Sequence, residues 1–154
     1  MSGKHITMAH GSGGLQSQSL LNDVIFEALG IKDHSMDDSA LLSDPDGNSL
    51  AFTTDSFVVQ PLEFPGGDIG RLAVCGTIND LSTCGATPLA LSLAFIIEEG
   101  FEIERISAIC RSIAATAAEA GVTIATGDTK VIERQSGDGL FINTAGIGVL
   151  SRPP

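Results

Sequence analysis

The sequence predicts an α+β domain in which helices pack on one face of a mixed, mostly antiparallel sheet. Two observations predict this class. Helical and strand patterns follow one another in the order strand, helix, hairpin, helix, strand, helix, strand, strand. Turn residues join two of the strand patterns directly, whereas a doubly wound parallel sheet joins its strands through helices. The length of 154 residues fits about one domain.

The first elements lie before residue 32. Lys4–Met8 is predicted as a short strand, and His10–Gly14 is too rich in glycine for regular structure. Apolar residues then recur at helical spacing from Leu20 to Leu29. Gly30 follows them and is a typical C-terminal stop, so we expect a helix that ends there.

A hairpin and a loop come next. The apolar stretches Ser39–Leu42 and Leu50–Thr54 flank the turn residues Asp44–Asn48, which predicts two antiparallel strands. Gln60–Gly67 contains two prolines and two glycines, and we therefore expect a loop without regular structure.

The second half of the chain carries two predicted helices and three strands. Asp68 can cap a helix that continues to about Cys84. Gly76 is unfavourable inside this helix, which indicates a packing or ligand requirement there. The remaining predicted elements are a buried strand Pro88–Ile97, a helix Glu102–Ala120 that ends at Gly121, strands Val122–Thr126 and Leu140–Leu150, the loop Glu133–Gly139 and a linker from Ser151.

Charge and composition exclude several classes of protein. The net charge is −11, from 8 Lys and Arg against 19 Asp and Glu, so nucleic acids and anionic membranes are poor partners. No apolar run approaches the ~20 residues of a membrane span, and the first residues do not resemble a signal peptide. We expect a cytoplasmic location, in which Cys75, Cys84 and Cys110 are reduced and act as small structural hydrophobes.

Carboxylates gather in the segment 33–70, which contains no Lys or Arg. Asp37, Asp38 and Asp55 adjoin apolar strands, where they cannot all face water without disrupting the strand. Hard divalent cations bound by carboxylate oxygens would balance such a cluster. The acids interpreted instead as solvated or turn residues are Asp33, Asp44 and Asp46.

Two further acids have unusual surroundings. Asp80 follows Asn79 inside an otherwise apolar helix, and Asp128 lies just past the strand predicted to end at Thr126, after Gly127. Each could be a satisfied cap or turn residue. Lys130 places a positive charge two residues from Asp128.

Metal-bound carboxylates attract phosphate, because the metal bridges protein and phosphate oxygens. The loop His10–Gly14 could cradle phosphate through its backbone N–H groups, with the N-terminus of the following helix behind it. Such a loop can also be merely flexible, and the sequence has neither a Walker A motif nor a G-x-G-x-x-G motif.

Several of these segments resemble one family. HGSGG, DDSALL, the block from Phe52 to Ala86, SLAFIIEEGF, TGDTKVIER and DGLFINTAGIG are similar to HypE-type hydrogenase-maturation proteins. That family belongs to the PurM-like ATP-binding superfamily, which includes the synthetases of aminoimidazole ribotide and selenophosphate and thiamine-phosphate kinase. The resemblance spans His10 to Gly148. The reactive Cys or selenocysteine that a selenophosphate synthetase carries near this glycine loop is absent.

The resemblance implies a PurM N-terminal-like fold and a homodimer whose sheets join into one barrel, with ATP near the interface. It implies that ATP drives dehydration of an enzyme-bound S-carboxamide to a thiocyanate, which supplies cyanide to [NiFe] hydrogenase. The implied partners are a HypF-type carbamoyltransferase and a HypC–HypD-type complex.

The resemblance also assigns site residues. Lys130 is the catalytic residue. The ATP-binding residues are His10, Gly11, Ser12, Gly13, Gly14, Thr54, Asn79, Thr129 and Lys130. The Mg²⁺ ligands are Asp37, Asp38, Asp55, Asp80 and Asp128. Which of Asp37 and Asp38 binds metal stays open, because neighbouring side chains on a strand face opposite ways.

The sequence ends at Pro154, before the second domain and the terminal cysteine that carries the substrate in this family. We therefore expect residues 1–154 to form the ATP-binding half of the enzyme, and not a complete catalyst. Two alternatives are another PurM-like synthetase or kinase, of the selenophosphate, aminoimidazole ribotide or thiamine phosphate type, and a non-catalytic dimerisation or docking module.

Overall fold

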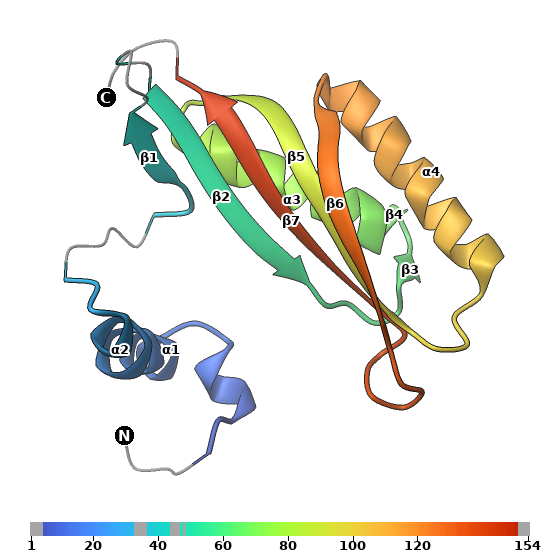
Figure 1. Cartoon of the computed structure of the whole chain (residues 1–154), viewed down its shortest axis with the longest axis horizontal. Helices are drawn as coiled ribbons and strands as arrows, with labels where there is room; N and C mark the ends of the chain where they lie inside the picture. Colours follow the sequence, from blue (N-terminus) through green and yellow to red (C-terminus); the bar gives the residue numbers. More distant parts are fainter. Residues whose placement is uncertain (1–4, 33–36, 44–46, 48, 151–154) are drawn as a thin grey trace. The chain divides into compact units, whose positions relative to one another are not determined.

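The computed structural model describes residues 5–32, 37–43, 47 and 49–150. It divides into two compact units, residues 1–36 and residues 37–154 (Figure 1). Within the described ranges, none of the helices combines the length and the apolar character that a bilayer span requires.

The N-terminal unit is helical. Its elements are the 3₁₀-helix η1 (Met8–His10), α1 (Leu15–Leu20), the π-helical segment η2 (Leu21–Phe26) and α2 (Glu27–Leu29). The predicted strand over Lys4–Met8 is wrong for the described residues, because the imidazole of His10 turns back onto Thr7 and fixes η1. The helix begins at Leu15, five residues earlier than predicted, and the stop at Gly30 is confirmed by its φ of 70°.

The second unit is built on a five-stranded sheet. Its strands are β1 (Ala40–Ser43), β2 (Ser49–Phe57), β5 (Thr87–Glu98), β6 (Thr123–Ile132) and β7 (Leu140–Val149). The order across the sheet is β1-β2-β7-β5-β6. Neighbouring strands are antiparallel except for β5 and β6, which are parallel. The mixed, mostly antiparallel sheet and the β1–β2 hairpin are thus confirmed, although the predicted turn lies outside the described residues apart from Gly47.

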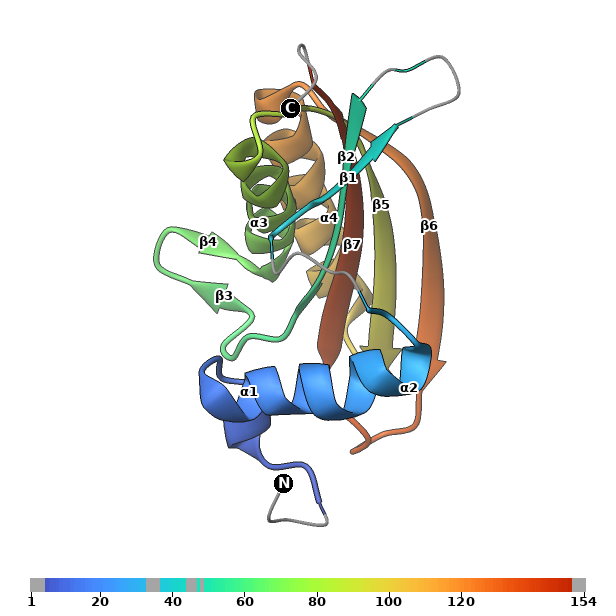
Figure 2. The ribbon, with the colours of Figure 1, turned by 90° about the vertical axis from the view of Figure 1, so that its left-hand side faces the viewer.

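Two helices, α3 (Ile69–Thr83) and α4 (Ile103–Ala120), cover one face of this sheet (Figure 2). The carboxylate of Asp68 caps α3 by accepting the Arg71 N–H at 2.8 Å, and Gly121 ends α4 with a φ of 70°, as predicted. The largest buried side chains of the core between helices and sheet are Leu62, Ile69, Val74, Leu91, Ile109, Leu140 and Ile142.

The segment predicted as a plain loop, Gln60–Gly67, is more ordered than expected. It contains most of a small hairpin of β3 (Glu63–Phe64) and β4 (Gly67–Asp68). Leu62, which is 1% exposed, anchors this hairpin in the core, and the Arg105 guanidinium binds the Glu63 carboxylate with two hydrogen bonds.

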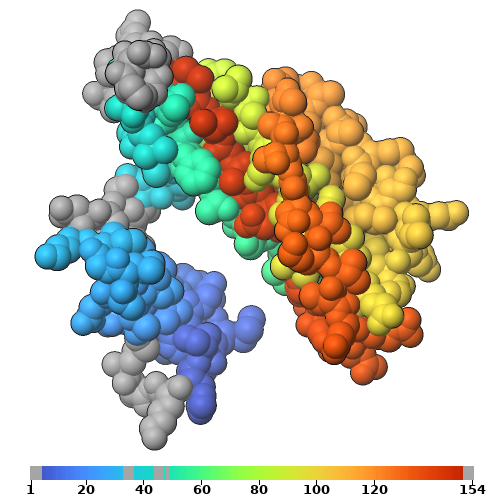
Figure 3. Space-filling model, in the orientation of Figure 1, coloured from blue at the N-terminus to red at the C-terminus, as the bar shows by residue number. Residues whose placement is uncertain are grey.

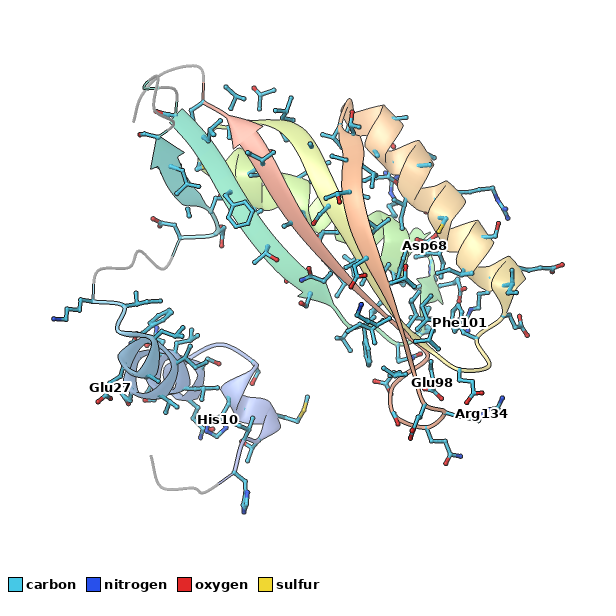
Figure 4. All side chains as sticks on the ribbon, in the orientation of Figure 1. His10, Glu27, Asp68, Glu98, Phe101 and Arg134 are labelled. Carbon is cyan, nitrogen blue, oxygen red and sulfur yellow. The ribbon has the colours of Figure 1, made fainter. Side chains whose placement is uncertain are left out.

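The second difference concerns β6. The strand was expected to end at Thr126, but it continues to Ile132 and includes Asp128. It pairs with β5 up to Glu98, whose carboxylate also accepts the backbone N–H groups of Gln135 and Gly139 at 2.7 and 3.3 Å (Figure 4). These bonds hold the β6–β7 loop at the end of β5, and the continued pairing with β5 keeps β6 extended beyond the predicted boundary.

Candidate functional site

Three of the predicted acids come together on the helix-covered side of the sheet. Asp38 precedes β1, Asp55 lies in β2 and Asp80 lies in α3. The Thr53 hydroxyl donates to the main-chain oxygen of Asp38 at 2.7 Å and contacts Oδ2 of Asp80 at 3.1 Å. The Ser39 hydroxyl donates to the main-chain oxygen of Asp80 at 2.9 Å. We call Asp38, Asp55 and Asp80 the acid cluster.

Burial and the neighbouring negative charges both act on the Asp80 carboxylate. Burial raises the pKa of Asp80, the hydrogen bond from Thr53 offsets part of this rise, and the negative charges of Asp38 and Asp55 add to it. Asp37 is exposed and is not among the causes of this shift. Of the two neighbouring acids, the structure thus brings Asp38 to the cluster.

Asp55 faces α3 across a glycine. Its register partner on β7 is Thr144, which is 0% exposed and lies under the helices. A Cβ at Gly76 would lie 2.8 Å from the ring of Phe57 and 4.0 Å from Oδ2 of Asp55. The packing requirement predicted for Gly76 is confirmed, since only glycine lets α3 approach β2 this closely.

Asp128 and Lys130 form a separate pair on β6. The ammonium of Lys130 lies 3.0 Å from Oδ2 of Asp128, and both side chains are exposed. The hydrogen bond from Lys130, together with one from the backbone of Thr129, lowers the pKa of Asp128. Asp128 therefore has a local counter-charge, which the acid cluster lacks among the described residues.

A β-bulge decides which way Asp128 points. Leu91 pairs with Ile124, but Ser92 pairs with Thr126, so Ala125 is an extra residue in β6. Asp128 consequently lies beside Ala94 on the open face of the sheet. Without the bulge Asp128 would lie beside Phe95, which packs against the core.

The predicted set of five metal ligands is therefore divided within one chain. β7 and β5 lie between β2 and β6, which separates Asp55 from Asp128 by about 14 Å, three interstrand spacings. The two groups also face opposite sides of the sheet. In the described part of the chain, no three His, Cys, Asp or Glu side chains converge closely enough to hold a metal ion by themselves.

The acid cluster nevertheless fits a divalent cation in its donor chemistry. Its carboxylate oxygens are the ligands that Mg²⁺ prefers, and their mutual repulsion is what a bound cation would relieve. Magnesium usually completes its coordination with water and substrate phosphates, so a partial set of protein ligands is consistent with it.

Other predicted ATP-binding residues lie in different places. Asn79 lines a hollow of about 240 Å³ between α3 and α4, beside Cys75, although its neighbour Asp80 contacts β2. Thr54 donates its hydroxyl to the main-chain oxygen of Thr144 at 3.0 Å. Thr129 is exposed on β6. The structure therefore does not gather these three around the acid cluster.

The glycine loop belongs to the N-terminal unit. His10, labelled in Figure 4, accepts the N–H of Thr7 at 3.1 Å through Nδ1 and lies 2.8 Å from the Thr7 hydroxyl. Gly13 and Gly14 have φ values of 79° and 80°, which favour glycine, and α1 begins immediately after them. The loop thus leads directly into a helix N-terminus, as predicted.

Sequence reasoning missed the buried hydroxyls of Ser39 and Thr53. A polar residue at an inward position of an apolar strand is a signal that could have found them, because a buried hydroxyl needs a partner. Asn143 was also missed. Its side-chain amide donates to the main-chain oxygen of Asp55 at 2.9 Å and to the Ser56 hydroxyl at 3.0 Å.

Comparison with known proteins identifies the family. The model of the AIR synthase related protein N-terminal domain matches residues 36–150. The chain belongs to this family. A solved structure, the thiamine monophosphate kinase from Aquifex aeolicus, superposes with a TM-score of 0.70 at 15% identity, over 90% of this chain and 45% of the kinase. At that identity the likeness shows the fold alone.

Nearer relatives of this AIR synthase related domain are HypE proteins, which confirms the resemblance. The chain is 50% identical over 154 residues to carbamoyl dehydratase HypE of Rhodobacter capsulatus, covering 98% of the chain and 44% of the relative. It is 49% identical over 152 residues to carbamoyl dehydratase HypE of Escherichia coli K12, and this match covers 95% of the chain and 45% of the relative. The chain thus spans less than half the length of these relatives.

Two solved structures extend the comparison. A HypE–HypF complex matches with a TM-score of 0.78 at 54% identity, over 87% of this chain and 43% of the matched one. A HypE structure in complex with ATP matches with a TM-score of 0.67 at 42% identity, over 96% of this chain and 44% of the matched one.

Proposed function

We propose that residues 1–154 form the ATP-binding half of a HypE-type carbamoyl dehydratase. The observation that carries this proposal is the 50% identity to carbamoyl dehydratase HypE over 98% of the chain. The ATP-bound HypE structure supports ATP as the cofactor. The kinase alternative rests on 15–16% identity, and that likeness concerns the fold.

The proposed reaction uses ATP to make an amide oxygen a good leaving group. The oxygen of the S-carboxamide attacks the γ-phosphorus of ATP, and ADP leaves as the terminal P–O bond breaks. The C–O bond then breaks as inorganic phosphate leaves, and the nitrogen releases its two protons to solvent, which leaves a thiocyanate. When bound, Mg²⁺ would neutralise phosphate charge. Asp38, Asp55, Asp80 and Asp128 would hold it, and Lys130 would stabilise charge on the transferring group.

We further propose that a second copy completes the site. The open face of the sheet, which faces the viewer in Figure 3, carries Phe52, 43% exposed, at a shallow hollow of about 210 Å³, and Ile96, 40% exposed, further along β5. Apolar surface of this kind is typical of an interface. Because Asp128 and Lys130 lie on the open face, association through that face would join the two sheets into a barrel and place this pair at the interface, where the site would draw on both copies.

The proposed partners follow from the relatives. The HypE–HypF complex supports a HypF-type carbamoyltransferase as the donor of the carbamoyl group. A HypC–HypD-type complex as the acceptor of cyanide rests on the family resemblance alone.

A nucleotide titration tests the proposal. Calorimetry with ATP is run on the 154-residue chain with Mg²⁺ and with EDTA, and sedimentation is measured at the same concentrations. We expect Mg²⁺-dependent, stoichiometric binding and a dimer. Dimerisation without nucleotide binding would instead support a docking module, and a monomer that binds ATP normally would overturn the shared site.

A further inference from the structure

Two buried hydroxyls tie the acid cluster together. Ser39 is 4% exposed and Thr53 is 5% exposed, and they connect β1, β2 and α3. We propose that Thr53, supported by Ser39, is a positioning residue that sets the orientation of the Asp80 carboxylate for the divalent cation. This inference rests on the proposed function, because it assigns Asp80 a cation to bind.

The geometry at Thr53 carries the inference. Its single hydroxyl proton faces two acceptors, the main-chain oxygen of Asp38 at 2.7 Å and Oδ2 of Asp80 at 3.1 Å. Among the described residues, this is the one hydrogen bond to the Asp80 carboxylate. Thr53 therefore engages Oδ2 and leaves Oδ1 available for a ligand.

Ser39 fixes the backbone at the same residue. Asp80 lies in the last turn of α3, three residues before the helix ends at Thr83. The hydroxyls of Ser39 and Thr83 donate to the main-chain oxygen of Asp80 at 2.9 and 2.7 Å. Because Ser39 follows Asp38, the start of β1 and the end of α3 are held in one arrangement, and Thr53 joins both to the strand that carries Asp55.

A purely structural role is the alternative. Thr53 and Ser39 would then satisfy buried main-chain oxygens, and their loss would lower stability without changing cation binding. The two roles are separable, because Thr53 also contacts the carboxylate whereas Thr116 does not. Thr116 is 3% exposed and donates to the main-chain oxygen of Ser112 at 2.8 Å within α4, so it is a matched control.

The experiment compares Thr53→Val, Thr53→Ser and Thr116→Val in the full 154-residue chain. Binding of ATP is titrated at several Mg²⁺ concentrations, and thermal unfolding is measured without either ligand. Removing groups that orient metal ligands typically weakens metal affinity about 10- to 100-fold. We expect Thr53→Val to weaken Mg²⁺-dependent binding to this extent. Thr53→Ser should retain binding, and Thr116→Val should match the wild type in affinity even if it melts earlier.

The outcomes are distinct. Wild-type affinity in a folded Thr53→Val protein overturns the positioning role and leaves the proposed function standing. A wild-type chain that binds no ATP with Mg²⁺ overturns the proposed function and this inference with it. If Thr53→Val does not fold, Ser39→Ala replaces it, with a smaller expected loss of Mg²⁺-dependent affinity. An unchanged affinity in that variant counts against the inference.

Discussion

The acid cluster and the Asp128–Lys130 pair use the same residue type in opposite settings. Asp80 is held by contacts from segments 27 and 41 residues away, and burial raises its pKa. Asp128 is held by a neighbour two residues along one strand, and the hydrogen bond from Lys130 lowers its pKa. The position of the acid cluster therefore depends on the packing of α3 against the sheet, whereas the position of the Asp128–Lys130 pair depends on the course of one edge strand.

The largest expected effect tests whether both regions bind the cation. Asp80→Asn and Asp128→Asn keep size and hydrogen bonding but each removes a ligand charge. We expect each to lower Mg²⁺-dependent ATP affinity by at least about 100-fold. Mutation of residues that only orient metal ligands already lowers metal affinity by up to about 100-fold, and loss of a ligand should have a larger effect. Calorimetry measures the affinity, with Glu104→Gln as an exposed acidic control on α4. Unchanged affinity in both variants would falsify the assignment of these acids as ligands.

A smaller effect tests how β6 is placed. A Cβ at Gly127 would overlap the main-chain oxygen of Leu93 on β5. We expect Gly127→Ala to displace β6 and to lower the free energy of unfolding by about 1–3 kcal/mol. Chemical denaturation measures this loss, and Thr123→Ala, an exposed position on the same strand, is the control. If Gly127→Ala and Thr123→Ala have the same free energy of unfolding, the close packing of β6 against β5 at Gly127 is wrong.

The smallest expected effect is on how stability changes with pH, and the direction of this change differs between the two regions. Because the pKa of Asp80 is raised on folding, the folded state loses stability as pH rises through that raised value. Asp80→Asn should therefore raise the ligand-free melting temperature at neutral pH, and this gain should vanish below the ordinary aspartate pKa.

The contribution of Asp128 to stability changes with pH in the opposite direction. Its pKa is lowered, so its contribution is present at neutral pH and is lost as pH falls through the lowered value. The pair is exposed, and exposed ion pairs contribute little. Melting curves of Asp128→Asn should thus lie on or slightly below those of the wild type at pH 7. A clear gain for Asp128→Asn, or a loss for Asp80→Asn, contradicts the comparison.

Local signals in the sequence were sufficient for much of the fold. The cap at Asp68, the stops at Gly30 and Gly121 and the β1–β2 hairpin depend on residues near them in the chain, and the structure confirms all of them. The course of β6 could not be predicted in this way, because the bulge at Ala125 interrupts the alternation that marks a strand.

The sequence was sufficient to identify most residues of the candidate site, but it did not predict how they are arranged in space. The acids were found because they adjoin apolar segments, and the structure brings Asp38, Asp55 and Asp80 together. Their separation from Asp128 depends on strand order, which no local pattern encodes. Thr53 and Ser39 were missed because their importance arises from contacts with α3 that form only in the folded chain.

The position of β6 at the edge of the sheet has a consequence for the protein in solution. Within the described residues no strand pairs with its outer side, so every second residue of this ten-residue strand presents unpaired backbone groups there, and Val131 beside them is 68% exposed. An edge of this length is a template on which another extended chain can add, and it favours aggregation. Asp128 and Lys130 place charges in the middle of that edge. The same two side chains thus help to keep the isolated protein from aggregating.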